Sequence, residues 1–450
     1  MEQYDIAIIG AGPGGYEMAV KAAAAGLKVA VVESGTPGGT CLNVGCIPTK
    51  CLCHSAEQAV AVGRDSVTLA AAMERKDAVV AQLADGVRSL LARPGITLHA
   101  ARARFVDART LALSAADGTE SRLSARYIVV ATGSAPRFLP IEGAHSRDVA
   151  TSTEMLSLTA VPKRLVVIGG GVIGMEFASI YNAFGAEVTV LEYCKEILPP
   201  FDRDIAKRLR MALKKSGVNI CTGAEVKAVC ELPGCGSTVT YVEKGKEVQI
   251  EADKVLMAVG RTACTEGLDL EKVGIEMGRG GIVVDENMQT SVPGVYAIGD
   301  VNGRCQLAHA ATFQGFHALG HILAAEGTGS DELAAIRFDI MPAAVFTVPE
   351  VALVGRTEEQ LKAEGVDYKV RKSLYRSCGK ALAMNESEGL VKLLEGEDGR
   401  ILGCHILGAH ASDLIHEAVV AMNADVTVAQ LGRMIHAHPS LSEILLMAAH

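Results

Sequence analysis

The chain has 450 residues, which is enough for two to four domains that each bury a core. Its formal net charge of -9 and its lack of any basic run argue against nucleic-acid binding. The longest uninterrupted apolar stretch, residues 165–175, is too short and too rich in glycine to cross a bilayer, and no signal peptide precedes the first predicted strand. We therefore expect a cytoplasmic protein without a membrane segment.

A dinucleotide-binding fingerprint lies close to the amino terminus. An apolar strand predicted at 4–9 leads into the glycine turn Gly10–Gly15, which is followed by a predicted helix at 16–25 and a second strand at 28–33. The glycines allow a tight turn and a close approach of the backbone to a pyrophosphate at the helix N-terminus. Glu33 ends the second strand and is placed to accept a hydrogen bond from a ribose hydroxyl.

Two cysteines follow in the glycine-framed segment 38–50, GGTCLNVGCIPTK. Cys41 and Cys46 are five residues apart, Lys50 closes the segment, and a helical run is predicted at 55–62. Two thiols can exchange an electron pair by forming and breaking one disulfide, and a nearby cation or helix N-terminus favours the thiolate. Beside a dinucleotide fingerprint, this segment predicts a redox centre.

Cys51 and Cys53 stand directly after this segment. We interpret them as helix packing residues, because a free cysteine usually behaves as a small apolar side chain. Two alternatives stay open: they are reactive thiols, or they bind a metal together with His54. The lack of a second ligand cluster argues against the metal, and no metal site is predicted.

The fingerprint occurs a second time at 164–192. A strand is predicted at 164–168, the glycines at 169–174, a helix at 175–184 and a strand at 185–192 that ends in Glu192. A carboxylate there bonds a free 2′-hydroxyl and repels a 2′-phosphate, so NAD is favoured over NADP. The nearby Lys195 leaves NADP as the alternative.

The rest of the chain alternates strands and helices up to about residue 336 and then changes to an α+β pattern. A polar connector is predicted at 145–163. Asp300 ends a predicted strand, at the sheet edge where α/β proteins bind ligands. The other predicted helices are at 65–92, 308–323, 412–422 and 428–434, and the other strands at 126–133, 254–261, 343–348, 390–394 and 401–406.

The C-terminal segment HAHPSLSE contains a second set of chemically active residues. Ser440 and Glu443 match a capping box that opens a predicted helix at 441–448. Alternatively, Glu443 orients the imidazole of His438 as the carboxylate partner of a general base. The spacing does not decide between these two roles. The bond between His438 and Pro439 is one of the few in the chain that can be cis.

With these motifs together, the chain resembles the pyridine nucleotide–disulfide oxidoreductases, and among them the dihydrolipoamide dehydrogenases. The resemblance extends over essentially all 450 residues and also includes the motifs ATGS, AVGR, PGVYAIGD, LAHAA and PEVALVG. It implies an α/β fold with two Rossmann-like domains, for FAD and NAD, and a C-terminal α+β dimerisation domain. The expected boundaries are 1–144 for the FAD domain, 145–264 for the NAD domain, 265–336 for a central domain that completes the FAD site, and 337–450 for the dimerisation domain.

The resemblance also implies roles for individual residues. Cys46 faces the flavin, Cys41 exchanges with the substrate, and Lys50 forms an ion pair with Glu176. His438 is the base, and it is supplied with Glu443 by the partner subunit of a homodimer. The implied FAD site consists of Gly10, Gly12, Gly14, Gly15, Glu33, Thr40, Lys50, Ala103, Thr132, Gly133, Ser134, Asp300 and Ala308. The implied NAD site consists of Gly169, Gly171, Gly174, Glu192, Val226 and Gly260.

The implied reaction is the oxidation of protein-bound dihydrolipoamide to lipoamide, with electrons passing through the cysteine pair and FAD to NAD⁺. The expected partner is the lipoyl domain of a 2-oxo acid dehydrogenase complex or of the glycine-cleavage system. Two alternatives are a related flavin enzyme that reduces a small disulfide, and a flavin-binding scaffold without catalysis. A scaffold would need none of the six catalytic residues Cys41, Cys46, Lys50, Glu176, His438 and Glu443.

Overall fold

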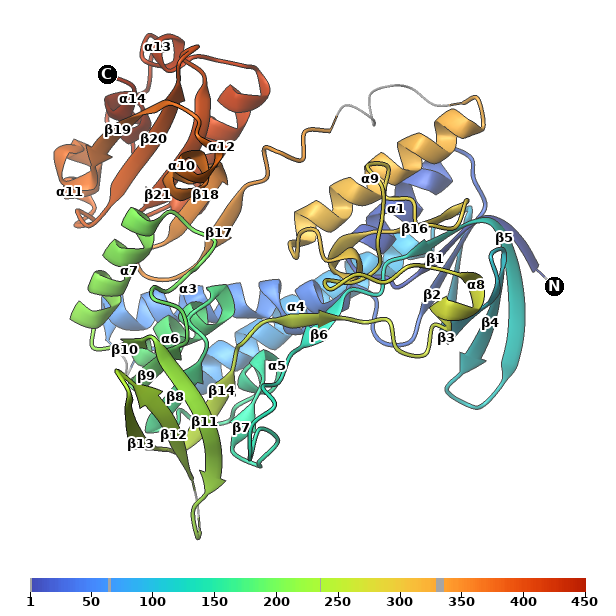
Figure 1. Cartoon of the computed structure of the whole chain (residues 1–450), viewed down its shortest axis with the longest axis horizontal. Coiled ribbons are helices and arrows are strands. Elements are labelled where there is room, and N and C mark those ends of the chain that lie inside the picture. Colours follow the sequence, from blue (N-terminus) through green and yellow to red (C-terminus); the bar gives the residue numbers. More distant parts are fainter. Residues whose placement is uncertain (1, 64–65, 235, 329–335) are drawn as a thin grey trace. The chain divides into compact units, whose positions relative to one another are not determined.

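The computed structural model of the chain describes residues 2–63, 66–234, 236–328 and 336–450 (Figure 1). They form two compact units, each assembled from segments that are distant in sequence. Unit 1 consists of Met1–Cys51, Glu74–Arg137 and Arg261–Ile336, and unit 2 consists of Leu52–Met73, Phe138–Gly260 and Arg337–His450. The α/β fold class is confirmed, whereas the boundaries of the four domains stay predictions.

Unit 1 is built on one sheet that is parallel at its centre. Strands β2, β1, β5 and β16 pair side by side in parallel, and the first half of β3 pairs with β2 in the same way. The second half of β3 continues with β4 and β5 into an antiparallel extension. The bounds are β1 Glu2–Ile9, β2 Val29–Glu33, β3 Ile96–Asp107, β4 Thr110–Ala115, β5 Glu120–Val130 and β16 Val295–Ala297.

Helices α1 and α9 pack closely against each other in unit 1 (Figure 1). Glycines make this possible, because a Cβ on Gly14 would lie 2.9 Å from the carbonyl oxygen of Ala311. The helices are α1 Pro13–Ala24, α2 Gly39–Val44, α8 Leu270–Val273 and α9 Ala308–Ala325, while α3 Cys46–Val62 and α4 Leu69–Leu91 have residues in both units. Helix α3 therefore begins well before the predicted 55, and residue 65 of the predicted helix 65–92 lies outside the described residues.

The first half of unit 2 carries the second fingerprint. Five parallel strands lie in the order β10-β9-β8-β14-β7, next to the antiparallel sheet β11-β12-β13. The predicted connector 145–163 was wrong in part, because it contains β7 and the short helix α5, which a Thr151–Glu154 capping box opens. The bounds are β7 Val149–Ala150, α5 Ser152–Met155, β8 Arg164–Ile168, α6 Val172–Ala183, β9 Glu187–Glu192, α7 Arg203–Lys215, β10 Asn219–Thr222, β11 Ala224–Glu231, β12 Ser237–Glu243, β13 Lys246–Ala252 and β14 Lys254–Met257.

The second half of unit 2 is the α+β part. Its antiparallel sheet has the order β17-β18-β21-β20-β19, and α12 packs on β18 and β21. The predicted strand 343–348 ends earlier, at Val345, and the predicted helix 428–434 ends at Leu431. The bounds are β17 Ala343–Val345, β18 Val351–Gly355, α10 Glu358–Glu364, β19 Tyr368–Leu374, α11 Gly379–Ala383, β20 Leu390–Gly396, β21 Ile401–Leu407, α12 Ala411–Asn423, α13 Val428–Leu431 and α14 Glu443–Ala449.

None of the helices in the described ranges is long and apolar enough to span a membrane. The cytoplasmic location stays a prediction.

A buried ionic cluster joins the two halves of unit 2. Lys392 on β20 is 1% exposed, and its Nζ lies 2.8 Å from Asp202, 3.2 Å from Asp204 and 2.5 Å from Glu358. Asp202 is fully buried and caps the N-terminus of α7. Hydrogen bonding to Lys372 and the charge of Lys392 lower the pKa of Asp204 to about 2. The buried lysine thus neutralises carboxylates from α7 and α10.

We predict that Lys392→Met destabilises the protein by about 3–5 kcal/mol, because it leaves buried carboxylates without their cation. The midpoint of chemical denaturation measures the effect. Lys372→Met is the matched control: Lys372 contacts the same Asp204 but is 43% exposed, so its loss should cost no more than about 1 kcal/mol. Equal shifts in the two variants would contradict the role of the buried cluster.

Candidate functional site

The first glycine turn connects β1 to α1 in unit 1. A Cβ on Gly10 would lie 2.4 Å from the carbonyl oxygen of Ala131, and one on Gly15 would lie 2.0 Å from that of Gly10, so neither position admits a side chain. Gly12 is the N-cap of α1 and supplies no side-chain cap, so the N–H groups of the first turn stay available to an anion. This turn fits the pyrophosphate of a dinucleotide.

Glu33 holds the turn from the end of β2. Its carboxylate accepts hydrogen bonds of 2.7 Å from the backbone N–H of Ala11 and of 2.7 Å from that of Gly35. Each carboxylate oxygen has a further lone pair that can accept a hydrogen bond from a hydroxyl group. The predicted ribose contact is therefore compatible with the structural contacts that Glu33 makes.

The cysteine segment packs directly on this glycine turn. The N–H of Gly38 donates to the carbonyl oxygen of Ala11 at 2.8 Å. A Cβ on Gly39 would lie only 2.7 Å from the Cα of Gly12, and both Gly38 and Gly39 have positive φ. Only glycine permits this approach, which places the start of the cysteine segment against the predicted dinucleotide site.

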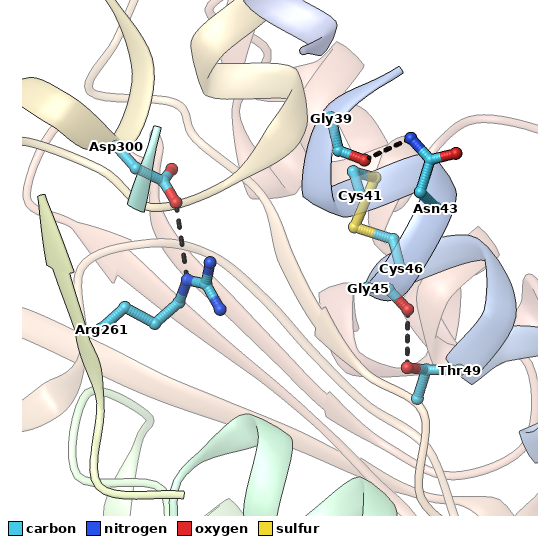
Figure 2. Close-up of a disulfide and its surroundings, with 8 residues drawn as sticks. All are labelled: Gly39, Cys41, Asn43, Gly45, Cys46, Thr49, Arg261 and Asp300. Atoms are coloured by element: carbon cyan, nitrogen blue, oxygen red, sulfur yellow. Dashed lines mark hydrogen bonds and ion pairs between the residues drawn. A yellow bond between two sulfur atoms is a disulfide. The ribbon is translucent and has the colours of Figure 1, made fainter. Parts of the chain in front are cut away.

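Cys41 and Cys46 are joined by a disulfide, with their Cα atoms 4.6 Å apart (Figure 2). Cys41 lies in α2 and Cys46 begins α3. Gly45 separates the two helices, and a Cβ there would lie 2.8 Å from the carbonyl oxygen of Thr40. The structure thus bears out the pairing implied by the resemblance.

Side chains next to the disulfide brace the helices that carry it (Figure 2). Asn43 Nδ2 donates to the carbonyl oxygen of Gly39 at 2.9 Å, and Thr49 Oγ1 donates to that of Gly45 at 2.6 Å. Lys50 follows Cys46 by one turn of α3, which puts the two residues on the same side of that helix.

Ser134, Asp300 and Arg261 form a polar cluster in unit 1. Ser134 Oγ donates to Asp300 Oδ2 at 2.6 Å, while Arg261 Nε donates to Ser134 Oγ at 2.6 Å. The guanidinium lies 3.9 Å from Asp300 (Figure 2), and Thr132 donates to the carbonyl oxygen of Cys264 at 2.6 Å. Burial lowers the pKa of Arg261, and the charge of Asp300 opposes this change.

Arg261 was not among the predicted site residues. Its signal was its place directly after Gly260 in the motif AVGR. Gln314 on α9 was also missed: it is 2% exposed and accepts hydrogen bonds from Gly299 N at 2.8 Å and from Asn302 Nδ2 at 2.9 Å. Gln314 therefore fixes the turn that carries Asp300, and no local pattern pointed to it.

The second glycine turn, between β8 and α6 in unit 2, repeats the first. A Cβ on Gly169 would lie 2.3 Å from the carbonyl oxygen of Ala258, and one on Gly174 would lie 1.9 Å from that of Gly169. The N-cap, Gly171, supplies no side-chain cap, so the first turn of α6 can also receive an anion.

Glu192 is 6% exposed and accepts hydrogen bonds from Gly170 N at 2.5 Å and from Cys194 N at 2.6 Å. It therefore occupies the same place in the second turn as Glu33 does in the first. The exposed Lys195 follows in the loop after β9, and within the described residues it forms no ion pair with Glu192.

Three other predicted residues have clear places in unit 2. Glu176 on α6 is 2% exposed and accepts a 3.0 Å hydrogen bond from Phe346 N. Val226 lies at the bulge of β11, and Gly260 follows β14 with a φ of +111°. Lys50 belongs to unit 1, so its ion pair with Glu176 stays a prediction.

The predicted residues separate cleanly between the two units. Unit 1 contains Gly10, Gly12, Gly14, Gly15, Glu33, Thr40, Cys41, Cys46, Lys50, Ala103, Thr132, Gly133, Ser134, Asp300 and Ala308. Unit 2 contains Gly169, Gly171, Gly174, Glu176, Glu192, Val226, Gly260, His438 and Glu443.

His438 and Glu443 form a hydrogen-bonded pair in unit 2. His438 Nδ1 lies 2.9 Å from Glu443 Oε1, and the His438 side chain is 79% exposed. Because the carboxylate is an acceptor, Nδ1 carries the hydrogen and Nε2 is left as a proton acceptor. The bond to Pro439 is cis. Hydrogen bonds from Ser440 N and from His438 lower the pKa of Glu443, so its carboxylate stays charged.

The capping-box prediction was wrong in one of its two arms. Ser440 N donates to Glu443 Oε2 at 2.8 Å, as a capping box requires. However, α14 begins only at Glu443 with Ser442 as its N-cap, and Ser440 Oγ has no hydrogen-bond partner within the described residues. Glu443 therefore orients His438 and holds the Ser440 backbone at the same time.

Comparison with known proteins shows the family to which the chain belongs. Residues 4–315 match the family model described as pyridine nucleotide-disulphide oxidoreductase, and residues 341–449 match the dimerisation domain of that family. The chain belongs to the pyridine nucleotide–disulphide oxidoreductases. The predicted family is thereby confirmed, as are FAD and NAD as the cofactors that its members use.

The relatives of this oxidoreductase cover the whole chain. Dihydrolipoyl dehydrogenase 1 of Arabidopsis thaliana mitochondria is 40% identical, over 100% of this chain and 90% of that protein. Dihydrolipoyl dehydrogenase of Bacillus subtilis is 42% identical, over 99% and 95%. Among solved structures, the HOCl-induced flavoprotein disulfide reductase RclA of Escherichia coli is similar with a TM-score of 0.88 and 32% identity, covering 99% of each chain.

We predict that this oxidoreductase prefers NADH to NADPH by at least about a hundredfold in kcat/KM, because a 2′-phosphate would meet the buried carboxylate of Glu192. Initial rates with the two nucleotides measure the preference, and Glu192→Gln should reduce it. Glu196→Gln is the control, because Glu196 already pairs with Arg210 at 2.7 Å. Equal wild-type rates with both nucleotides would contradict the role of Glu192.

Proposed function

We propose that the protein is a dihydrolipoamide dehydrogenase that uses Cys41, Cys46 and His438 to oxidise dihydrolipoamide with NAD⁺ as the final acceptor. The observation that carries this proposal is the disulfide itself, on a segment that packs through Gly39 against the first dinucleotide turn. A dithiol substrate can exchange electrons with a disulfide without any further oxidant. The Arabidopsis and Bacillus relatives bear the name of this activity.

The residues present fit both cofactors. The first turns of α1 and α6 have free N–H groups for a pyrophosphate, and Glu33 and Glu192 stand where a ribose hydroxyl would be bound. In unit 1, Asp300 and Ser134 offer further polar contacts to the flavin nucleotide. When bound, FAD supplies the acceptor for the electron pair of the reduced cysteines, and NAD⁺ supplies the acceptor for hydride.

In the first chemical step, His438 deprotonates the substrate. Its Nε2 takes the proton from a substrate thiol, because Nδ1 is held by Glu443. The resulting imidazolium is stabilised by the Glu443 carboxylate, whose lowered pKa keeps it charged. A neutral imidazole suits this work near neutral pH.

The second step is disulfide exchange. The substrate thiolate attacks Cys41 Sγ, the Cys41–Cys46 bond breaks, and Cys46 leaves as the thiolate. The second substrate thiol, once deprotonated, attacks the substrate sulfur of the mixed disulfide and releases Cys41. The substrate has then lost two electrons to form its own disulfide, and the cysteine pair holds them. Lys50, one turn beyond Cys46, provides a positive charge that favours the thiolate.

The match to the dimerisation domain supports a homodimer. Within this proposal, His438 and Glu443 serve the disulfide of the partner subunit, and the substrate is a lipoyl group on the lipoyl domain of a 2-oxo acid dehydrogenase complex or of the glycine-cleavage system. A second candidate is the reduction of a small disulfide, which the similarity to RclA favours.

We predict that two-electron reduction of the wild-type protein gives a long-wavelength absorbance from a thiolate against the flavin, and that Cys46→Ser abolishes it. Anaerobic titration followed by visible spectroscopy measures this band. Cys194→Ser, which changes an exposed cysteine outside the segment, should keep it. Persistence of the band in Cys46→Ser would refute the assignment of Cys46.

We predict that His438→Gln lowers the rate of dihydrolipoamide oxidation by about 10²–10⁴-fold, because it removes the general base, while the FAD content stays normal. Steady-state NADH formation and flavin absorbance measure the two properties. His410→Gln is the matched control, since His410 is also exposed and also pairs with a carboxylate, that of Asp413. Near wild-type turnover in His438→Gln would leave Glu443 with a structural role alone.

A further inference from the structure

The segment that carries His438 has little backbone support. Residues 435–440 lie between α13 and α14 in no helix or strand. Within the described part of the chain, none of their backbone groups takes part in a backbone–backbone hydrogen bond. Ile435, at the start of the segment, is fully exposed. Side chains must therefore hold the segment in place, and Glu443 does so only on its C-terminal side.

His436 holds the N-terminal side. Its Nε2 lies 2.6 Å from Glu417 Oε1 on α12, and its Nδ1 lies 2.9 Å from the carbonyl oxygen of Met434. The His436 side chain is only 9% exposed, in contrast to 79% for His438. One histidine therefore lies in a partly buried pair, and the other, two residues later, is exposed.

Both ring nitrogens of His436 face acceptors. A carbonyl oxygen cannot donate, and an ionised carboxylate cannot either, so the ring satisfies both contacts only when Nδ1 and Nε2 each carry a hydrogen. Burial alone lowers the pKa of His436, but the hydrogen bonds to Glu417 and to Met434 outweigh it, and the pKa is raised. The pair is therefore an imidazolium bonded to a carboxylate, a charge-assisted hydrogen bond.

We propose that His436 and Glu417 are positioning residues, whose partly buried ion pair fixes the segment 435–440 so that the His438 imidazole points at the substrate thiol. This inference rests on the proposed function and adds to it a second histidine–carboxylate pair. His436 and Glu417 act through His438, since both nitrogens of His436 are engaged and neither can take up the substrate proton.

The test separates thiol-side from nicotinamide-side reduction of the holoenzyme by stopped flow. In Glu417→Gln, reduction by dihydrolipoamide should slow by about tenfold or more, because a misplaced base loses proton transfer. Reduction by NADH, which does not need His438, should stay within about twofold of wild type. His436→Asn is measured in parallel and should show the same split, so the test does not depend on the folding of one variant.

Asp413→Asn is the matched control, because it breaks an exposed histidine–carboxylate pair on the same helix, with 3.7 Å between His410 Nδ1 and Asp413 Oδ2. It should leave both half-reactions unchanged. Wild-type thiol-side rates in Glu417→Gln and His436→Asn, or an equal fall in both half-reactions, would overturn the positioning role alone. Absence of dihydrolipoamide turnover in the wild type would instead overturn the proposed function.

Discussion

The contact between two glycines, Gly12 and Gly39, is the constraint on which the proposed chemistry depends. Gly12 is the N-cap of α1 in the dinucleotide turn, and Gly39 is the first residue of α2, which carries Cys41. A Cβ at Gly39 would lie 2.7 Å from the Cα of Gly12. The hydrogen bond from Gly38 to Ala11 fixes the same approach. The segment that carries the disulfide therefore packs on the turn that we propose to bind the FAD pyrophosphate.

Three carboxylates in the structure each orient neighbouring backbone N–H groups or a side chain. Glu33 and Glu192 each bind two backbone N–H groups at a glycine turn and still have lone pairs to offer a ribose. Glu443 does the same for a backbone N–H and an imidazole. In each case one side chain determines both local backbone geometry and the position of a reacting or binding group, which links the fold to the function.

Much of the site could be predicted from the sequence because its motifs are local. The glycine turns, Cys41 and Cys46, and the spacing from His438 to Glu443 each lie within a few residues, where backbone geometry leaves few alternatives. Contacts between distant segments could not be predicted in this way: Gln314 under the Asp300 turn, Arg261 on Ser134, and Glu417 on His436 depend on tertiary packing. The late start of α14 at Glu443 also escaped prediction, because the Ser440 hydroxyl does not cap the helix.

We propose that the cysteine pair exchanges electrons with a dihydrolipoyl dithiol and passes them through FAD to NAD⁺. The most direct measurement compares two assays on the purified holoenzyme: NAD⁺ reduction by dihydrolipoamide and NADPH oxidation by glutathione disulfide. The proposed mechanism predicts rapid turnover in the first assay and little in the second. Turnover with glutathione disulfide and NADPH, without activity toward dihydrolipoamide, would contradict it and would identify the protein as a reductase of small disulfides.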